Sequence, residues 1–92
     1  MKMLREERAD IPQQVSDVLQ KFARSIEAIH VELRDKNGRR GGGDKRVRIR
    51  VQLAAGMATL VVEEERASIR MAVRHAAARA ASGVRTLLRR KT

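Results

Sequence analysis

Two short alternating segments near the middle of the chain carry polar and charged side chains that could bind a ligand or take part in a reaction. Their polar side chains are His30, Glu32 and Arg34 in the first segment and Arg46, Arg48 and Arg50 in the second. Alternation places these side chains on one face of a strand and the intervening Val, Ile and Leu residues on the other. A sheet needs only the apolar face to build a core. An anionic partner is therefore the first explanation to consider for so many arginines.

Protection of the sheet is the alternative explanation for the strand arginines, because charged side chains commonly protect a sheet against aggregation. We favour this alternative, since a sheet that binds single-stranded RNA stacks the bases on aromatic side chains. Phe22 is the only aromatic residue of the chain. An RRM-like or OB-like reader of single strands is therefore not expected.

A second set of cations lies in the C-terminal third, where apolar residues recur at helical spacing from about residue 65. Arg70, Arg74, Arg85 and Arg89 share the face opposite the apolar stripe, and Arg79 and Arg90 lie on a flank. No carboxylate follows Glu65 in the sequence, so ion pairs within the helix do not explain these cations. Guanidinium groups suit phosphate, and each neutralised phosphate releases counterions. A solvated helix face is the alternative for any single arginine.

Catalytic and metal-binding patterns are missing from the sequence. The two histidines, His30 and His75, have no partnered nucleophile, and the chain has no cysteine. The glycines at 41–43 lack the spacing of a nucleotide-binding loop and open no helix, so a flexible linker is expected there. We therefore expect no enzyme, no cofactor and no metal.

Length and charge point to one small basic domain covering residues 1–92. The 21 Lys and Arg residues against 11 Asp and Glu residues give a formal net charge of +10, which favours nucleic acid or an anionic membrane surface as partner. The longest mostly apolar run, at 53–62, is too short to span a bilayer, and no signal peptide is recognised. The expectation is a cytoplasmic protein that does not enter the membrane.

The first predicted helix begins at Asp10, with Pro12 in its first turn and a break in the chain near 9–12. Its apolar stripe runs from Ile11 through Phe22 to Ile26. Residues 1–9 carry a poor pattern and could be a frayed arm, a helical extension or an irregular edge strand, of which the arm and the degenerate strand are expected. If they do not pair, one sheet edge stays open and offers a surface for a homodimer.

Three strands and a second helix follow. The strands are predicted at 28–34, 45–53 and 58–63, with a loop at 35–44 and a tight turn at Gly56. The second helix begins near Glu65, with the acidic run 63–65 at its N-terminus, where the helix dipole favours negative charge. Gly83 either allows this helix to approach the sheet closely or kinks it.

These elements predict an α+β fold, a two-layer sandwich with both helices on one face of a three- or four-stranded antiparallel sheet. The order of elements is then βαβββα or αβββα. The residues expected to be largely buried are Phe22, Val31, Ile49, Val51, Leu60 and Val73.

Four stretches carry a family resemblance. They are IHVELRD at 29–35, GGGDKR at 41–46, MAV at 71–73 and AAAR at 76–79. In order and spacing they resemble the ribosome hibernation-promoting factors, also called ribosome-associated inhibitors or sigma-54 modulation proteins, over about residues 11–90. The chain is similar to the short form of this family, which lacks a C-terminal dimerisation domain.

The resemblance implies a βαβββα fold like that of a double-stranded RNA-binding domain, although the first strand is degenerate or missing here. It also implies binding to the small ribosomal subunit near the decoding centre, with inhibition of translation in starvation or stationary phase. The residues that match the RNA-binding helices of the family are Lys21, Arg24, Arg74, Arg79, Arg85, Arg89 and Arg90.

The sequence therefore supports three functional hypotheses. The first is a non-enzymatic, rRNA-binding hibernation factor, a stress-response regulator of translation. The second is a general binder of structured RNA with similar topology, and the third is a protein-interaction module that self-associates.

Overall fold

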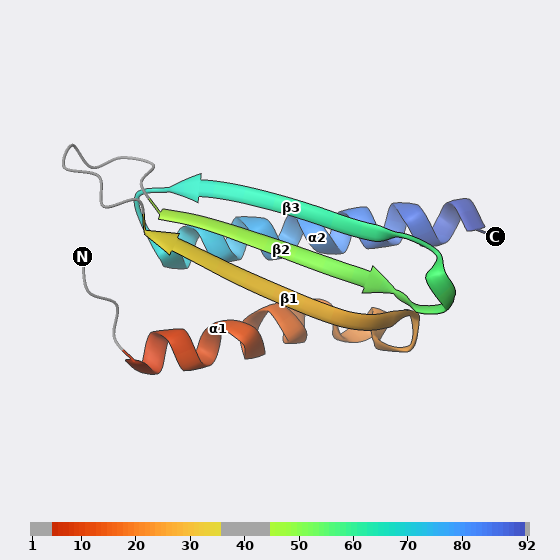
Figure 1. Ribbon diagram of the computed structural model, residues 1–92, viewed down its shortest axis with the longest axis horizontal. Helices are drawn as coiled ribbons and strands as arrows, with labels where there is room; N and C mark the ends of the chain where they lie inside the picture. Colours follow the sequence, from red (N-terminus) through yellow and green to blue (C-terminus); the bar gives the residue numbers. More distant parts are fainter. Residues whose placement is uncertain (1–4, 36–44, 92) are drawn as a thin grey trace.

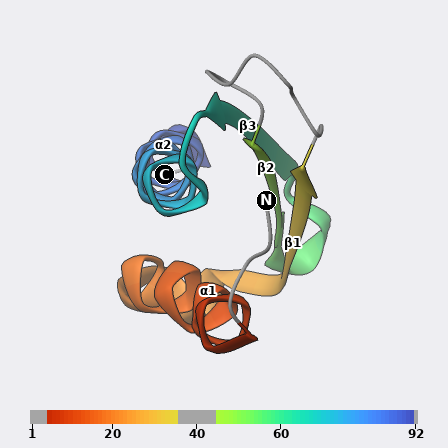
Figure 2. The ribbon, with the colours of Figure 1, turned by 90° about the vertical axis from the view of Figure 1, so that its left-hand side faces the viewer.

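The described part of the chain comprises residues 5–35 and 45–91 of a computed structural model (Figure 1). The elements in chain order are α1 (Arg5–Val18), the 3-10 helix η1 (Gln20–Ser25), β1 (Ile26–Asp35), β2 (Lys45–Leu53), the 3-10 turn η2 (Ala54–Gly56), β3 (Thr59–Arg66) and α2 (Ile69–Lys91). The described residues form an antiparallel sheet in the order β1-β2-β3. Both helices lie on the same side of this curved sheet (Figure 2), which confirms the predicted α+β sandwich.

The core is built on the middle strand, β2. Every second residue of β2, from Val47 to Leu53, is buried, and the alternation predicted from the sequence is confirmed. Across the register, Ile49 lies between Val31 of β1 and Val62 of β3. The helical layer covers this face with buried residues, which are Ile11 and Val15 of α1, Leu19 at the start of η1, and Ala72, Val73, Ala76, Ala80 and Val84 of α2.

Gly83 permits a close approach between α2 and the sheet. A Cβ atom at this position would lie only 2.9 Å from Leu60 Cδ2. The helix continues past Gly83 to Lys91. Of the two explanations that the sequence left open, the structure therefore supports close packing. The turn at Gly56 is also confirmed, because Ala55 and Gly56 both adopt positive φ angles, 59° and 65°.

The burial prediction holds for part of the set. Ile49, Val51 and Val73 are buried, but Phe22, Val31 and Leu60 are only partly buried. For Phe22, the reason is that α1 ends at Val18 and the chain continues as a 3-10 helix. The tighter winding of a 3-10 helix moves Phe22 off the stripe that Ile11 and Val15 define.

The predicted start of the first helix is wrong. Asp10 is not an N-cap, because α1 begins at Arg5 and passes through Pro12 without a break. Residues 5–9 are therefore helical, which is the helical extension among the alternatives and neither an arm nor a strand, while residues 1–4 lie outside the described part. The buried stripe of α1 explains this outcome, since tertiary packing can outweigh the cost of an internal proline. The expected loop also lies outside the described residues, at 36–44.

The predicted start of the second helix is wrong, and the acidic run 63–65 does not lie at its N-terminus, although Glu63 was correctly placed in the third strand. Glu63, Glu64 and Glu65 lie in β3, and α2 begins only at Ile69, with no acidic residue in its first turn. Ser68 provides the cap, because the Met71 backbone N–H donates a hydrogen bond to Ser68 Oγ at 3.3 Å. These glutamates therefore do not interact with the dipole of α2 as expected. Their side chains instead form ion pairs with Arg46, Arg48 and Arg79.

Candidate nucleic-acid interface

Five of the predicted cations form what we call the helical cation surface, namely Lys21 and Arg24 of η1 and Arg74, Arg85 and Arg89 of α2. All five side chains are exposed. Separations of eleven and four residues keep Arg74, Arg85 and Arg89 on one face of α2, because an α-helix has 3.6 residues per turn. At 1.5 Å per residue, this face extends over about 22 Å.

Phe22 joins the two elements of this surface. The Lys21 Nζ atom lies 5.5 Å from the centroid of the Phe22 ring, and the Arg85 Cζ atom lies 5.9 Å from it. Both distances suit a cation–π interaction. The ring therefore places a cation of η1 near a cation of α2. Sequence reasoning treated Phe22 only as a core residue, although a lone aromatic residue next to a lysine was a signal for this contact.

Arg74 lies beside an open groove between the two helices. The groove is lined by Gln14 and Val18 of α1 and by Arg70, Val73, Arg74 and Ala77 of α2, and its volume is about 500 Å³. Val18 at its wall is 44% exposed. The groove gives the N-terminal half of the surface a concave shape next to a permanently charged side chain.

Arg79 has a different environment from the helical cation surface. Its Nη1 atom donates to Glu64 Oε2 at 2.6 Å and to the main-chain oxygen of Glu63 at 2.8 Å. These contacts attach α2 to β3, and the assignment of Arg79 to RNA binding stays a prediction. Arg90, which is exposed, follows Arg79 by eleven residues and shares its side of the helix.

Glu64 is the carboxylate at the centre of this attachment. Its side chain is only 11% exposed and also accepts a hydrogen bond from Arg66 Nη2 at 2.8 Å. The hydrogen bond from Arg79, followed by that from Arg66, holds the pKa of the Glu64 carboxyl below its ordinary value of 4.5. No sequence pattern indicated this contact, because it joins residues fifteen apart on different elements.

Replacing Glu64 by Gln is expected to lower the stability of the protein at neutral pH. Because the folded-state pKa is depressed, the ionised carboxylate contributes stability above pH 4.5 that is lost as pH falls through the folded pKa. The difference in unfolding free energy between wild type and Glu64→Gln should therefore shrink below pH 4.5. Urea unfolding at several pH values measures it. Glu27→Gln is the matched control, and a difference that persists in acid would contradict the assignment.

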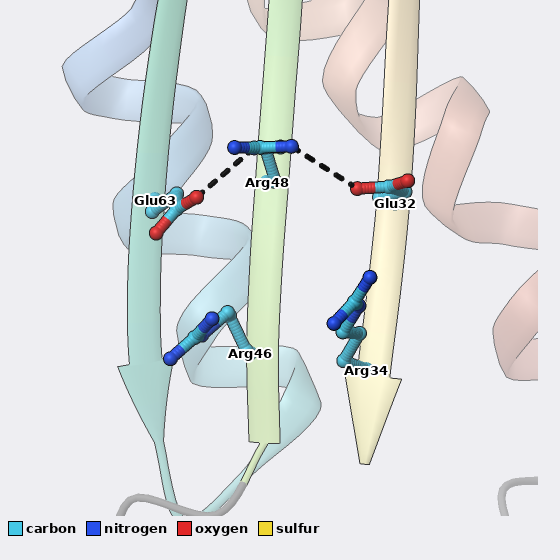
Figure 3. Close-up of a pocket in the computed structure, with 5 residues that line it drawn as sticks. All are labelled: Glu32, Arg34, Arg46, Arg48 and Glu63. Carbon is cyan, nitrogen blue, oxygen red and sulfur yellow. Dashed lines mark hydrogen bonds and ion pairs between the residues drawn. The ribbon is translucent and has the colours of Figure 1, made fainter. Parts of the chain in front are cut away.

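The outer face of the sheet contains an ion-pair network (Figure 3). Arg48 lies between Glu32, at 3.7 Å, and Glu63, at 2.9 Å. Arg46 pairs with Glu65 at 3.4 Å. Glu32, Arg34, Arg46, Arg48 and Glu63 line a hollow of about 130 Å³. Arg46 and Arg48 therefore pair with three glutamates, which favours the protective role that the sequence suggested for the strand cations.

Arg34 and Arg50 are the remaining arginines of the outer face. Both are exposed, and neither forms an ion pair with a carboxylate in the described part of the chain. Arg34 lies directly across from Arg46, and Arg50 lies across from His30. His30 is exposed, and His75 is partly buried on α2. Within residues 5–35 and 45–91, no group of three or more His, Asp or Glu side chains could hold a metal ion.

Comparison with known proteins adds no family assignment, because no protein-family model matches the chain and a search of curated proteins also finds no match. None of the helices in the described ranges is both long enough and apolar enough to cross a membrane. The function must therefore be argued from the helical cation surface and from the resemblance in sequence.

Proposed function

We propose that this protein is a non-enzymatic ribosome hibernation factor that binds small-subunit rRNA near the decoding centre and inhibits translation in idle cells. Its place of action is then the cytoplasm. The proposal rests on the family resemblance in residues 29–35, 41–46 and 71–79 together with the basic side of the two helices. The paired helices on one side of a sheet agree with the fold that the resemblance implies.

One observation carries the proposal, the absence of carboxylate partners for four of the helical cations within the described residues. Lys21, Arg24, Arg74 and Arg85 have no carboxylate partner in the described part of the chain. Among the described residues of the outer sheet face, Arg46 and Arg48 are paired with glutamates, whereas Arg34 and Arg50 are not. Cations without an internal partner favour an external anion, and arginine offers a fork of donors that matches a phosphate group.

Co-sedimentation with purified small ribosomal subunits across a salt series tests this function. If four phosphate contacts form, the logarithm of the binding constant should fall with the logarithm of salt concentration at a slope of about −3 to −4. No binding at low salt would contradict the proposal. An unrelated RNA duplex is the comparison, because equal affinity for the duplex would support a general binder of structured RNA.

A further inference from the structure

The edge strand β1 has an apolar flank that this chain does not fully cover. Its inward side chains Ile29, Val31 and Leu33 are only partly buried. Their register partners on β2, which are Val51, Ile49 and Val47, each have 0% exposure. The difference arises because β1 is an edge strand. In the described part of the chain, no strand pairs with the edge of β1 that faces away from β2. An open edge with apolar side chains is a template for another strand.

A hollow beside the start of β1 extends this uncovered region. Its volume is about 240 Å³, and its apolar lining comes from Leu19, Ala23, Ile26, Ala28 and Ile29. It lies between η1 and the first half of the strand. Through Ile29 the hollow adjoins the partly buried inner side chains of β1, and Ser16, Gln20 and Glu27 complete its lining.

We propose that two copies of this chain pair antiparallel through β1, with the two-fold axis at Val31. The two three-stranded sheets then form one continuous six-stranded sheet. Pairing Val31 with Val31 of the second copy keeps inward residues opposite inward residues, because side chains alternate with a period of two. Residues 28–34 of each copy take part in the new ladder.

In this register β1 is complementary to itself, which favours a second copy of this chain as the partner at the open sheet edge. On the inner face, Ile29 lies opposite Leu33 of the second copy, and the symmetry repeats this apolar pair. On the outer face, His30 lies opposite Glu32 of the second copy, so the imidazole can donate a hydrogen bond to the carboxylate. No pair of like charges is created among the residues of this ladder.

Neighbouring registers are less favourable. An axis at Glu32 would place two carboxylates directly opposite each other, which is destabilising. An axis at Leu33 would place Asp35 opposite Val31, so an acidic residue would stand across from an apolar one. The axis at Val31 is the register that keeps apolar and charged positions matched along seven residues of each strand.

Salt should act on this dimer in the opposite direction to its action on RNA binding. Two copies that each carry a formal charge of +10 repel each other at low ionic strength. Screening of this repulsion strengthens the dimer, whereas salt weakens contacts to phosphate. Association measured without RNA therefore tests the interface independently of the proposed function, and either one can fail alone.

Sedimentation equilibrium of the full chain, from low to moderate salt, is the first test. We expect a dimer whose fraction increases with salt for wild type, and a monomer for Val31→Lys. Val61→Lys is the matched control, because Val61 is 48% exposed on the outer face of β3 and the variant adds the same charge away from β1. It should remain dimeric. A wild type that stays monomeric at every salt concentration would overturn the proposal.

Cross-linking tests the register directly, because the chain has no cysteine of its own. Val31→Cys should form a disulfide dimer under mild oxidation, since directly opposed Cα atoms lie about 5 Å apart. Ile29→Cys alone should not, because its two copies are offset by four residues, or about 13 Å. Mixing Ile29→Cys with Leu33→Cys should restore the cross-link. Equal rates for both single variants would overturn the register, even if Val31→Lys failed to fold.

Discussion

Replacing Arg74, Arg85 and Arg89 together by Gln should weaken binding to the small ribosomal subunit by up to roughly 100-fold, from about 1 kcal/mol for each exposed charge contact. The salt slope should become less steep by about 3, because three phosphate contacts no longer release counterions. The three side chains lie on the exposed face of α2, so the fold should persist. Co-sedimentation across a salt series measures both quantities.

The matched control removes the same number of charges from the other side of the molecule. Arg46, Arg48 and Arg50 lie on the outer sheet face, and two of them are already paired with glutamates. Their replacement by Gln should cost less affinity than the loss of the three α2 arginines. Equal loss from both variants would mean that the protein is held by undirected charge attraction and has no defined RNA-binding face.

Replacing Pro12 by Ala should stabilise the protein by about 2 kcal/mol. An internal helix proline costs about 3 kcal/mol relative to alanine, because it removes one hydrogen bond and its ring crowds the preceding turn. The substitution also makes the unfolded chain more flexible, and this entropy gain reduces the stabilisation by less than about 1 kcal/mol. Urea unfolding measures the change, and the exposed side chain of Pro12 makes a packing change small.

Gln14→Ala is the control for Pro12→Ala, since Gln14 is also exposed on α1 and the two residue types differ little in helix propensity. Its effect should stay within about 0.5 kcal/mol. If Pro12→Ala were equally silent, the helix would not continue through this position as it does in the structure.

Prediction of the strands from the sequence succeeded because their signal is local. Alternation with a period of two predicted a strand at 45–53, the same bounds as β2. Each strand contains enough alternating residues to fix its own face. The class of fold followed from these strands and the apolar stripes of the two helices.

Prediction of the helix boundaries failed where a local signal competed with packing. Asp10 and Pro12 have the residue types of a helix start, but Ile11 and Val15 are buried in a helix that begins earlier. Glu63 and Glu65 were likewise placed at the N-terminus of the second helix, but both lie in β3. Glu63 and Glu65 are two residues apart, as are Arg46 and Arg48, and the two pairs have opposite charge. This matching pattern was a signal for cross-strand pairing.

The sequence predicted which residues belong to the candidate interface, but it predicted their arrangement in space only in part. Helical spacing placed Arg74, Arg85 and Arg89 together, and the structure agrees. The contact between Arg79 and Glu64 depends on how α2 lies on β3, which no local pattern specifies. The same holds for the position of Arg85 near Phe22, because these two residues are 63 positions apart in the sequence.

Chemical probing of small-subunit rRNA, with and without the protein, shows directly whether the helical cation surface binds at the decoding centre. We expect protections that cluster at the decoding centre, weaken with rising salt and disappear for the variant that lacks Arg74, Arg85 and Arg89. Protections scattered over the rRNA, or a decoding-centre footprint that this variant retains, would contradict the claim that the helical cation surface binds there.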